Sequence, residues 1–175
     1  MNNAYRLKPD IYINPRLTAI YDELNQPGVD TEFYIGLAEA HKSILDMGCG
    51  TGWLACELAA LGHSVIGADP APAMLDVARR RPRGSAVTWI ETIASDFSID
   101  TRFDLIIMTG HVFQVFLSDD EVVSALSTLR RHLAPGGRLA FETRNPALRA
   151  WETWTPAKTG RCLEFADLGS IHVHN

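Results

Sequence analysis

The chain is poor in cysteine, and its three cysteines form neither a disulfide framework nor a zinc-ligand pattern. Cys49, Cys56 and Cys162 are scattered over 175 residues and include no C-x-x-C pair. The first residues, Met1–Arg6, lack the apolar run of a secretion signal. Together with the odd cysteine count, this is typical of a protein in the reducing cytoplasm. We therefore expect a cytoplasmic protein without a bound metal.

Positive charge and long apolar runs are also scarce. The formal net charge is −5, which argues against a nucleic-acid partner because phosphate backbones are bound by basic faces. No apolar run approaches the length that spans a bilayer, so we expect no membrane partner. One basic run, Arg79-Arg80-Arg81-Pro82-Arg83, is interpreted as the solvated end of a helix whose charges complement the helix dipole.

Glycine is concentrated in one short stretch that organises the rest of the chain. The apolar run Ile44-Leu45 leads to Asp46, glycines follow at 48, 50 and 52, and a helix-favouring segment starts at Trp53. This pattern predicts a strand, a tight turn and a helix N-terminus. A ligand can lie against the bare backbone of such a turn, within reach of unpaired helix N–H groups.

Short apolar runs alternate with helical patterns, separated by brief loops. This alternation predicts an α/β fold, a Rossmann-like open parallel sheet with helices on both faces. The expected strands are Ser43–Met47, Ser64–Ala68, Ala86–Glu91, Phe103–Met108 and Arg138–Thr143. The expected helices between them are Trp53–Leu61, Ala71–Arg81 and Asp119–Leu133, the last with an N-cap signal at Ser118.

The chain is expected to be a single domain of three parts. Residues 1–42 form an N-terminal helical cap, with helices at Asn14–Asn25 and Thr31–Ala40. Residues 43–145 form the Rossmann-like core. Residues 146–175 contain a helix at Pro146–Trp154, and the alternation in Arg161–Phe165 and Ser170–His174 is compatible with a hairpin.

The unusual residues fall at the carboxyl ends of the predicted strands, where open α/β sheets bind ligands. Asp69 ends the second strand, 17 residues after Gly52. A carboxylate there can accept hydrogen bonds from both hydroxyls of a ribose, although an Asp before Pro70 is also a common helix cap. The third glycine comes one residue earlier than in the dinucleotide fingerprint G-x-G-x-x-G, which disfavours NAD.

Several of these motifs resemble those of the class I S-adenosylmethionine-dependent methyltransferases. The stretch Leu45–Gly52 is similar to motif I of that family, and Gly67–Leu75 is similar to its acidic motif. Phe103–Met108 and Leu133–Leu139 resemble the motifs of strands four and five. Further similarity to a bacterial subgroup acting on small molecules is found in Tyr21–Asn25, Phe33-Tyr34, Thr109–Gln114 and Thr143–Pro146.

The resemblance implies a cofactor site for S-adenosylmethionine, with S-adenosylhomocysteine as product. The glycines would lie under the methionine part, Asp46 near its ammonium group and Asp69 at the ribose. Met74 would pack on the adenine, and Thr109 and Gly110 would flank the methionine part. The full expected set is Asp46, Gly48, Cys49, Gly50, Gly52, Asp69, Pro70, Met74, Ile93, Ala94, Thr109 and Gly110.

Two departures from the family pattern are visible. Relatives commonly carry Gly-Asp-Ala after strand three, whereas this chain has Thr92-Ile93-Ala94. Either Asp96 or main chain holds the adenine amino group in its place, or the affinity for the cofactor is reduced. Relatives also usually continue further and add two sheet strands. We therefore expect the edge of the fifth strand to be covered by a second copy in a homodimer or by the C-terminal residues themselves.

The residues after strands four and five supply candidates for the acceptor side. His111 is the candidate general base, with an orienting role as the alternative. Tyr21, Gln114, Arg144 and Asn145 are candidates for contact with the substrate.

Three functions remain open from the sequence. The first is methyl transfer by in-line displacement to a small-molecule acceptor, which needs positioning and exclusion of water more than acid–base chemistry. The second is a module that binds the cofactor without catalysis. The third is an NAD-type oxidoreductase, which the glycine spacing disfavours.

Overall fold

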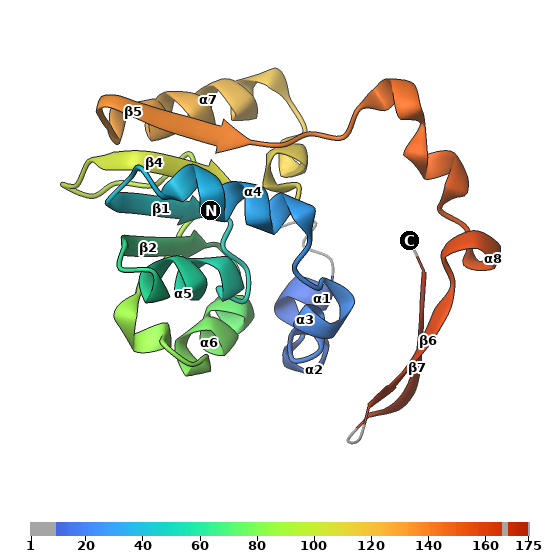
Figure 1. The fold of residues 1–175 in the computed structure, drawn as a ribbon. Helices are drawn as coiled ribbons and strands as arrows, with labels where there is room; N and C mark the ends of the chain where they lie inside the picture. The colour runs from blue at the N-terminus through green and yellow to red at the C-terminus, as the bar shows by residue number, and fades with distance from the viewer. Residues whose placement is uncertain (1–9, 166–167, 175) are drawn as a thin grey trace. The chain divides into compact units, whose positions relative to one another are not determined.

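The computed structural model describes residues 10–165 and 168–174, which divide into two compact units, Met1–Glu142 and Thr143–Asn175. The first unit contains a parallel sheet of five strands in the order β3-β2-β1-β4-β5 (Figure 1). Its strands are β1 (Ser43–Met47), β2 (Ser64–Asp69), β3 (Thr88–Glu91), β4 (Phe103–Met108) and β5 (Leu133–Phe141). The predicted Rossmann-like sheet is confirmed.

Apolar side chains alternate between two cores, one on each face of the sheet. Ile44 and Leu105 join a buried cluster with α4 (Val29–Ala38) and α5 (Trp53–Ala60). The next residues along the same strands, Leu45 and Ile106, join a second cluster with α7 (Asp119–Arg131). This period of two places helices on both faces, as predicted. The helix α6 (Pro72–Arg80) lies against β2 and β3.

The α7 helix begins where the sequence predicts, because Ser118 is its N-cap. The Ser118 hydroxyl accepts a hydrogen bond from the Glu121 backbone N–H at 3.3 Å. No helix among residues 10–165 and 168–174 is long and apolar enough to cross a membrane.

The N-terminal segment is more broken than predicted. In place of one helix over Asn14–Asn25, the structure has α2 (Pro15–Thr18) and α3 (Tyr21–Leu24), preceded by α1 (Asp10–Ile13). The backbone leaves helical geometry at Ile20, whose φ and ψ are −103° and 4°. A hydrogen bond from the Asn25 side-chain amide to the Tyr21 carbonyl, 2.9 Å long, closes the end of α3.

Strand boundaries in β3 and β5 also differ from prediction, and β5 ends at Phe141 rather than Thr143. β3 begins at Thr88 rather than Ala86, because Gly84–Ala86 form the 3₁₀ turn η2. β5 begins at Leu133 rather than Arg138 because Leu133 already pairs with Phe103; a register shift then leads to the pairing of Leu105 with Arg138. Gly136, with φ of 79°, lies within this irregular stretch.

The second unit lacks the predicted helix Pro146–Trp154. Two 3₁₀ turns replace it, η4 (Pro146–Leu148) and η5 (Ala150–Thr153), because Arg149 between them has a left-handed backbone with φ of 45°. A short helix α8 (Pro156–Thr159) and an antiparallel hairpin of β6 (Arg161–Phe165) and β7 (Gly169–Val173) follow. Within this unit the Arg144 guanidinium lies 4.9 Å from the centre of the Trp154 ring.

Candidate active site

The turn after β1, residues Gly48–Gly52, is held by the neighbouring strand and is called the glycine turn below. The backbone N–H groups of Gly48 and Cys49 both donate to the Ala68 carbonyl of β2, at 2.7 and 3.1 Å. Gly48, Gly50 and Gly52 all have positive φ, at 80°, 54° and 75°. Such a backbone is accessible to glycine at little cost and explains the spacing in the sequence.

The three glycines face different surroundings. A Cβ on Gly48 would lie 2.4 Å from a methyl of Val112, and a Cβ on Gly52 would lie 2.4 Å from the Trp89 ring. A Cβ on Gly50 would meet nothing within 4 Å. Gly48 and Gly52 are therefore needed for packing, whereas Gly50 exposes bare backbone to open space where a ligand can lie.

Asp69, at the end of β2, is hydrogen-bonded to the backbone of the glycine turn. One of its carboxylate oxygens accepts the Gly50 N–H at 3.0 Å, and the other accepts the Ala71 N–H at 2.7 Å. The residue is only 8% exposed. The roles of Asp69 as a backbone cap and as a ribose ligand are compatible with each other. Each carboxylate oxygen has the capacity for a second hydrogen bond besides the one to the backbone.

Asp46, at the end of β1, is a buried acid with an unsatisfied oxygen. Its residue is 1% exposed, and Oδ1 has no hydrogen-bond partner among the described residues. Burial, and then the charge of nearby Asp69, raise its pKa to about 7. Two acids at adjacent strand ends create a place that favours a cation, since a positive group would stabilise both carboxylates.

The rim after β4 is more open. His111 has a left-handed backbone with φ of 66°, and its imidazole is 44% exposed. Glu142, the residue after β5, accepts the His111 backbone N–H at 2.8 Å and a hydrogen bond from the Tyr34 hydroxyl. The same carboxylate lies 3.9 Å from Nδ1 of His111. Burial and the bond to Glu142 raise the pKa of Tyr34, so Tyr34 is a donor at neutral pH.

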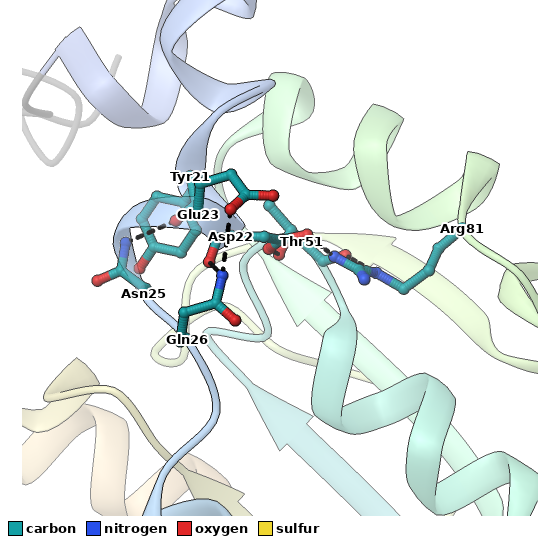
Figure 2. Close-up of polar contacts among 7 residues, drawn as sticks. All are labelled: Tyr21, Asp22, Glu23, Asn25, Gln26, Thr51 and Arg81. Atoms are coloured by element: carbon teal, nitrogen blue, oxygen red, sulfur yellow. Dashed lines mark hydrogen bonds and ion pairs between the residues drawn. The ribbon is translucent and has the colours of Figure 1, made fainter. Parts of the chain in front are cut away.

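The sequence interpretation missed a polar cluster beside the glycine turn. Figure 2 shows Asp22 of α3, Thr51 of the glycine turn and Arg81 at the end of α6 converging on one another. The Thr51 hydroxyl donates to Asp22 at 2.5 Å, Arg81 forms an ion pair with Asp22, and Nε of Arg81 donates to the Thr51 carbonyl at 3.0 Å. The view of Arg81 as a solvated helix end is therefore wrong; its side chain is 16% exposed.

Comparison with known proteins decides the family. A family model described as "Methyltransferase domain" matches residues 44–137, more than half of the chain, from within β1 to within β5. The chain belongs to the class I S-adenosylmethionine-dependent methyltransferases. S-adenosylmethionine is the cofactor of this family.

Relatives of several chemistries are similar to this methyltransferase. A cypemycin N-terminal methyltransferase from Streptomyces sp is 30% identical over 106 residues, which are 61% of this chain and 43% of that protein. A ubiquinone biosynthesis O-methyltransferase from Cereibacter sphaeroides is 33% identical over 147 residues, 81% of this chain and 58% of that protein. The chain spans about half the length of these curated relatives.

A solved structure supports the fold. S-adenosylmethionine-bound CalS10, an amino pentose methyltransferase from Micromonospora echinaspora, has a TM-score of 0.67 and 20% identity, and the match covers 97% of this chain and 81% of that one. At this identity the likeness concerns the fold alone.

The residues of the site fit the cofactor. S-adenosylmethionine carries an ammonium and a sulfonium, and the unsatisfied Asp46 oxygen and the Asp69 carboxylate offer negative charge where the glycine turn leaves open space. Burial raises the pKa of the Cys49 thiol, so Cys49 is a neutral wall of the turn rather than a nucleophile.

The other expected cofactor residues lie at the same strand ends or beside them. Pro70 precedes α6, and Met74 lies in its first turn. The Met74 side chain is fully buried. Ala94 is buried in the second apolar cluster, while Ile93 beside it is half-buried. Thr109 and Gly110 follow β4, and Gly110 has a φ of 63° with open space around it.

The candidate acceptor residues are distributed over both units. Tyr21 and the exposed Gln114 belong to the first unit, where Gln114 donates its backbone N–H to the His111 carbonyl at 2.9 Å. Arg144 and Asn145 belong to the second unit. The Asn145 side chain caps η4 by accepting the Ala147 N–H at 3.0 Å, so it has a structural role.

Proposed function

We propose that this protein transfers a methyl group from S-adenosylmethionine to a small-molecule acceptor by in-line displacement. When bound, the cofactor supplies a methyl group already activated by a positively charged sulfur. The proposal is carried by one observation, the pair of buried acids Asp46 and Asp69 beneath a glycine turn whose Gly50 faces open space. An acidic pair favours a cationic cofactor and disfavours the pyrophosphate of a dinucleotide.

The chain's own residues would act mainly by positioning. Asp46 and Asp69 would hold the cationic and ribose ends of the cofactor, and Thr109 and Gly110 would shape the space beyond β4. Acceptor attack on the methyl carbon forms the new bond, and the bond from that carbon to sulfur breaks. When the acceptor arrives protonated, His111 would take the proton, and Glu142, which accepts the His111 N–H, would hold its loop.

The relatives suggest which acceptors to test first. A cypemycin N-terminal methyltransferase and a ubiquinone biosynthesis O-methyltransferase point to amines and hydroxyls as acceptor groups. The purified chain should be incubated with S-adenosylmethionine and a panel of small amines and phenols, and S-adenosylhomocysteine measured by mass spectrometry. We expect acceptor-dependent product that Asp69→Ala abolishes and that Asp76→Ala, at an exposed position on α6, leaves intact.

Two outcomes would redirect the proposal. Tight binding of S-adenosylhomocysteine with no turnover on any acceptor would favour a module that binds without catalysis. Binding of NAD in its place would favour the oxidoreductase.

We further propose a cytoplasmic homodimer. Among the described strands β5 pairs with β4 alone, so its other side is an edge that a second copy can cover. Light scattering at micromolar concentration tests this, and a strictly monomeric species with an exchange-exposed β5 edge would contradict it.

A further inference from the structure

The polar cluster of Asp22, Thr51 and Arg81 joins three segments that are distant in sequence. Asp22 and Arg81 are 59 residues apart, and Thr51 lies between them in the glycine turn. Each partner contacts the other two through a hydrogen bond or ion pair (Figure 2). Thr51 is used twice, as donor through its hydroxyl and as acceptor through its carbonyl, so the cluster fixes the main chain of the turn as well as a side chain.

The neighbour of Asp22 on α3 is Tyr21, which is half-buried. The pKa of Tyr21 is raised to about 12, mainly by burial and further by the nearby Tyr12, Asp69 and Asp22. The charge of Asp69 thus reaches the Tyr21 phenol, and the Tyr12 and Tyr21 ring centres are 6.0 Å apart. Asp22 directly follows Tyr21, so its hydrogen bond with Thr51 anchors α3 beside Tyr21.

Besides the polar cluster, the N-terminal segment, residues 10–25, is held by contacts of α1 and α2 with α6. Its three helices are four residues each, far below the length at which a helix is stable alone. Its buried residues from 12 onward are Thr18 and Ile20. Segments with few buried apolar groups open more readily than the core, so a polar attachment has a large share in their docking.

The two acids of the site are almost fully buried in this arrangement, Asp46 at 1% and Asp69 at 8% exposure. A ligand that must reach them requires some part of their cover to move. The segment that carries Tyr21 is made of short helices attached by the polar cluster and by the contacts of α1 and α2 with α6.

We propose that Asp22, Thr51 and Arg81 form a latch that docks the N-terminal segment onto the glycine turn and couples this docking to cofactor binding. The proposal rests on the cofactor site proposed above. The latch fixes the turn from outside, and a ligand lying on Gly50 fixes it from the other side. Because both favour the same turn conformation, each must strengthen the other by the same factor.

The test combines hydrogen exchange with calorimetry on the full chain. Exchange of residues 10–25 is followed by mass spectrometry with and without S-adenosylhomocysteine, and its dissociation constant is measured in parallel. The variants are Asp22→Asn, Arg81→Gln and the charge-exchanged pair Asp22→Arg with Arg81→Asp. The matched control is Arg79→Gln, which breaks the exposed Arg79–Asp76 ion pair on the same helix.

Loss of a charge-assisted hydrogen bond predicts binding about 5- to 30-fold weaker for Asp22→Asn and Arg81→Gln. Exchange of residues 10–25 should be about tenfold faster in these ligand-free variants, and the charge-exchanged pair should recover part of both losses. Arg79→Gln should change neither quantity by more than twofold. In the wild type, the ligand should slow exchange of the same residues.

The outcomes separate this proposal from the proposed function. Wild-type protein that does not bind S-adenosylhomocysteine contradicts the proposed cofactor site, while the ligand-free exchange rates still test the latch. Exchange of residues 10–25 in Asp22→Asn equal to that in Arg79→Gln overturns the latch. Faster exchange with unchanged affinity overturns the coupling.

Discussion

The two halves of the strand-end rim are built differently. At the ends of β1 and β2, the functional groups are buried: Asp46, Asp69 and Thr51 are all under 10% exposed, and the turn is defined by backbone angles. At the ends of β4 and β5 the groups are open: His111 is 44% and Phe141 37% exposed, and the segment after β4 is a single 3₁₀ turn, η3 (Val112–Val115).

This difference indicates a division of labour. A fixed, buried site suits a ligand that every catalytic cycle shares, such as a cofactor. An open rim of aromatic and polar side chains suits an acceptor, because side chains on irregular segments can vary without disturbing the sheet. In the open half, the rings of Phe113 and Phe141 stack with their centres 4.3 Å apart. Glu142 adds hydrogen bonds to Tyr34 and His111.

The strongest test of the buried half concerns Asp46 and pH. The folded carboxyl keeps its proton to about pH 7, whereas the unfolded one loses it near its ordinary pKa of 3.8. The folded state therefore binds more protons between these values, and stability falls as pH rises through this window. We expect a loss from this group of up to about 4 kcal/mol by pH 8.

Urea denaturation across pH 4–8 measures this loss. Asp46→Asn should remove the corresponding slope whatever its own effect on stability. An identical slope in the variant would show that Asp46 is not the buried acid described here.

The next test separates ligand contact from packing within the glycine turn. Gly52→Ala places a Cβ 2.4 Å from Trp89 at a positive φ and should lower the free energy of unfolding by about 2–3 kcal/mol. Gly50→Ala has open space and should cost about 1 kcal/mol from backbone strain alone.

Affinity for S-adenosylhomocysteine should distinguish the same two variants. Gly50→Ala should weaken binding by more than its stability loss explains, since its Cβ enters the ligand's space. Equal stability losses in the two variants, with binding intact in Gly50→Ala, would remove Gly50 from the site.

The smallest effect is expected in the open half. Glu142→Ala leaves the Tyr34 hydroxyl and the His111 N–H without their acceptor and should cost about 1–2 kcal/mol. A double-mutant cycle with Tyr34→Phe should give a coupling of about 1 kcal/mol in urea denaturation. Additive effects, with Tyr12→Phe as the control for tyrosine truncation, would mean that Glu142 does not link α4 to the β4 loop.

The sequence predicted the buried half well because its signals are local. The bounds of β1 and β4 were given correctly by continuous apolar runs, and the glycine spacing reflects three backbone angles within five residues. The position of Asp69 at a strand end could be predicted because it is a feature of the linear sequence, and its contact with a ribose stays a prediction.

The missed features are those that depend on distant residues. The ion pair of Asp22 with Arg81 joins residues 59 positions apart, and the periodicity of the sequence does not reveal it. Arg81 therefore resembled an ordinary basic helix end. Glu142 was missed for the same reason, since its partners Tyr34 and His111 come from other elements. The predicted helices Asn14–Asn25 and Pro146–Trp154 failed because apolar spacing alone does not register a local break such as the left-handed Arg149.

The most direct test of the central claim is calorimetry of the wild-type chain with S-adenosylhomocysteine and, separately, with NAD. We expect one site for S-adenosylhomocysteine, no detectable NAD binding, and a loss of at least about 30-fold in affinity on Asp69→Ala, the equivalent of about 2 kcal/mol. Binding of NAD, or S-adenosylhomocysteine binding unchanged by Asp69→Ala, would contradict this claim.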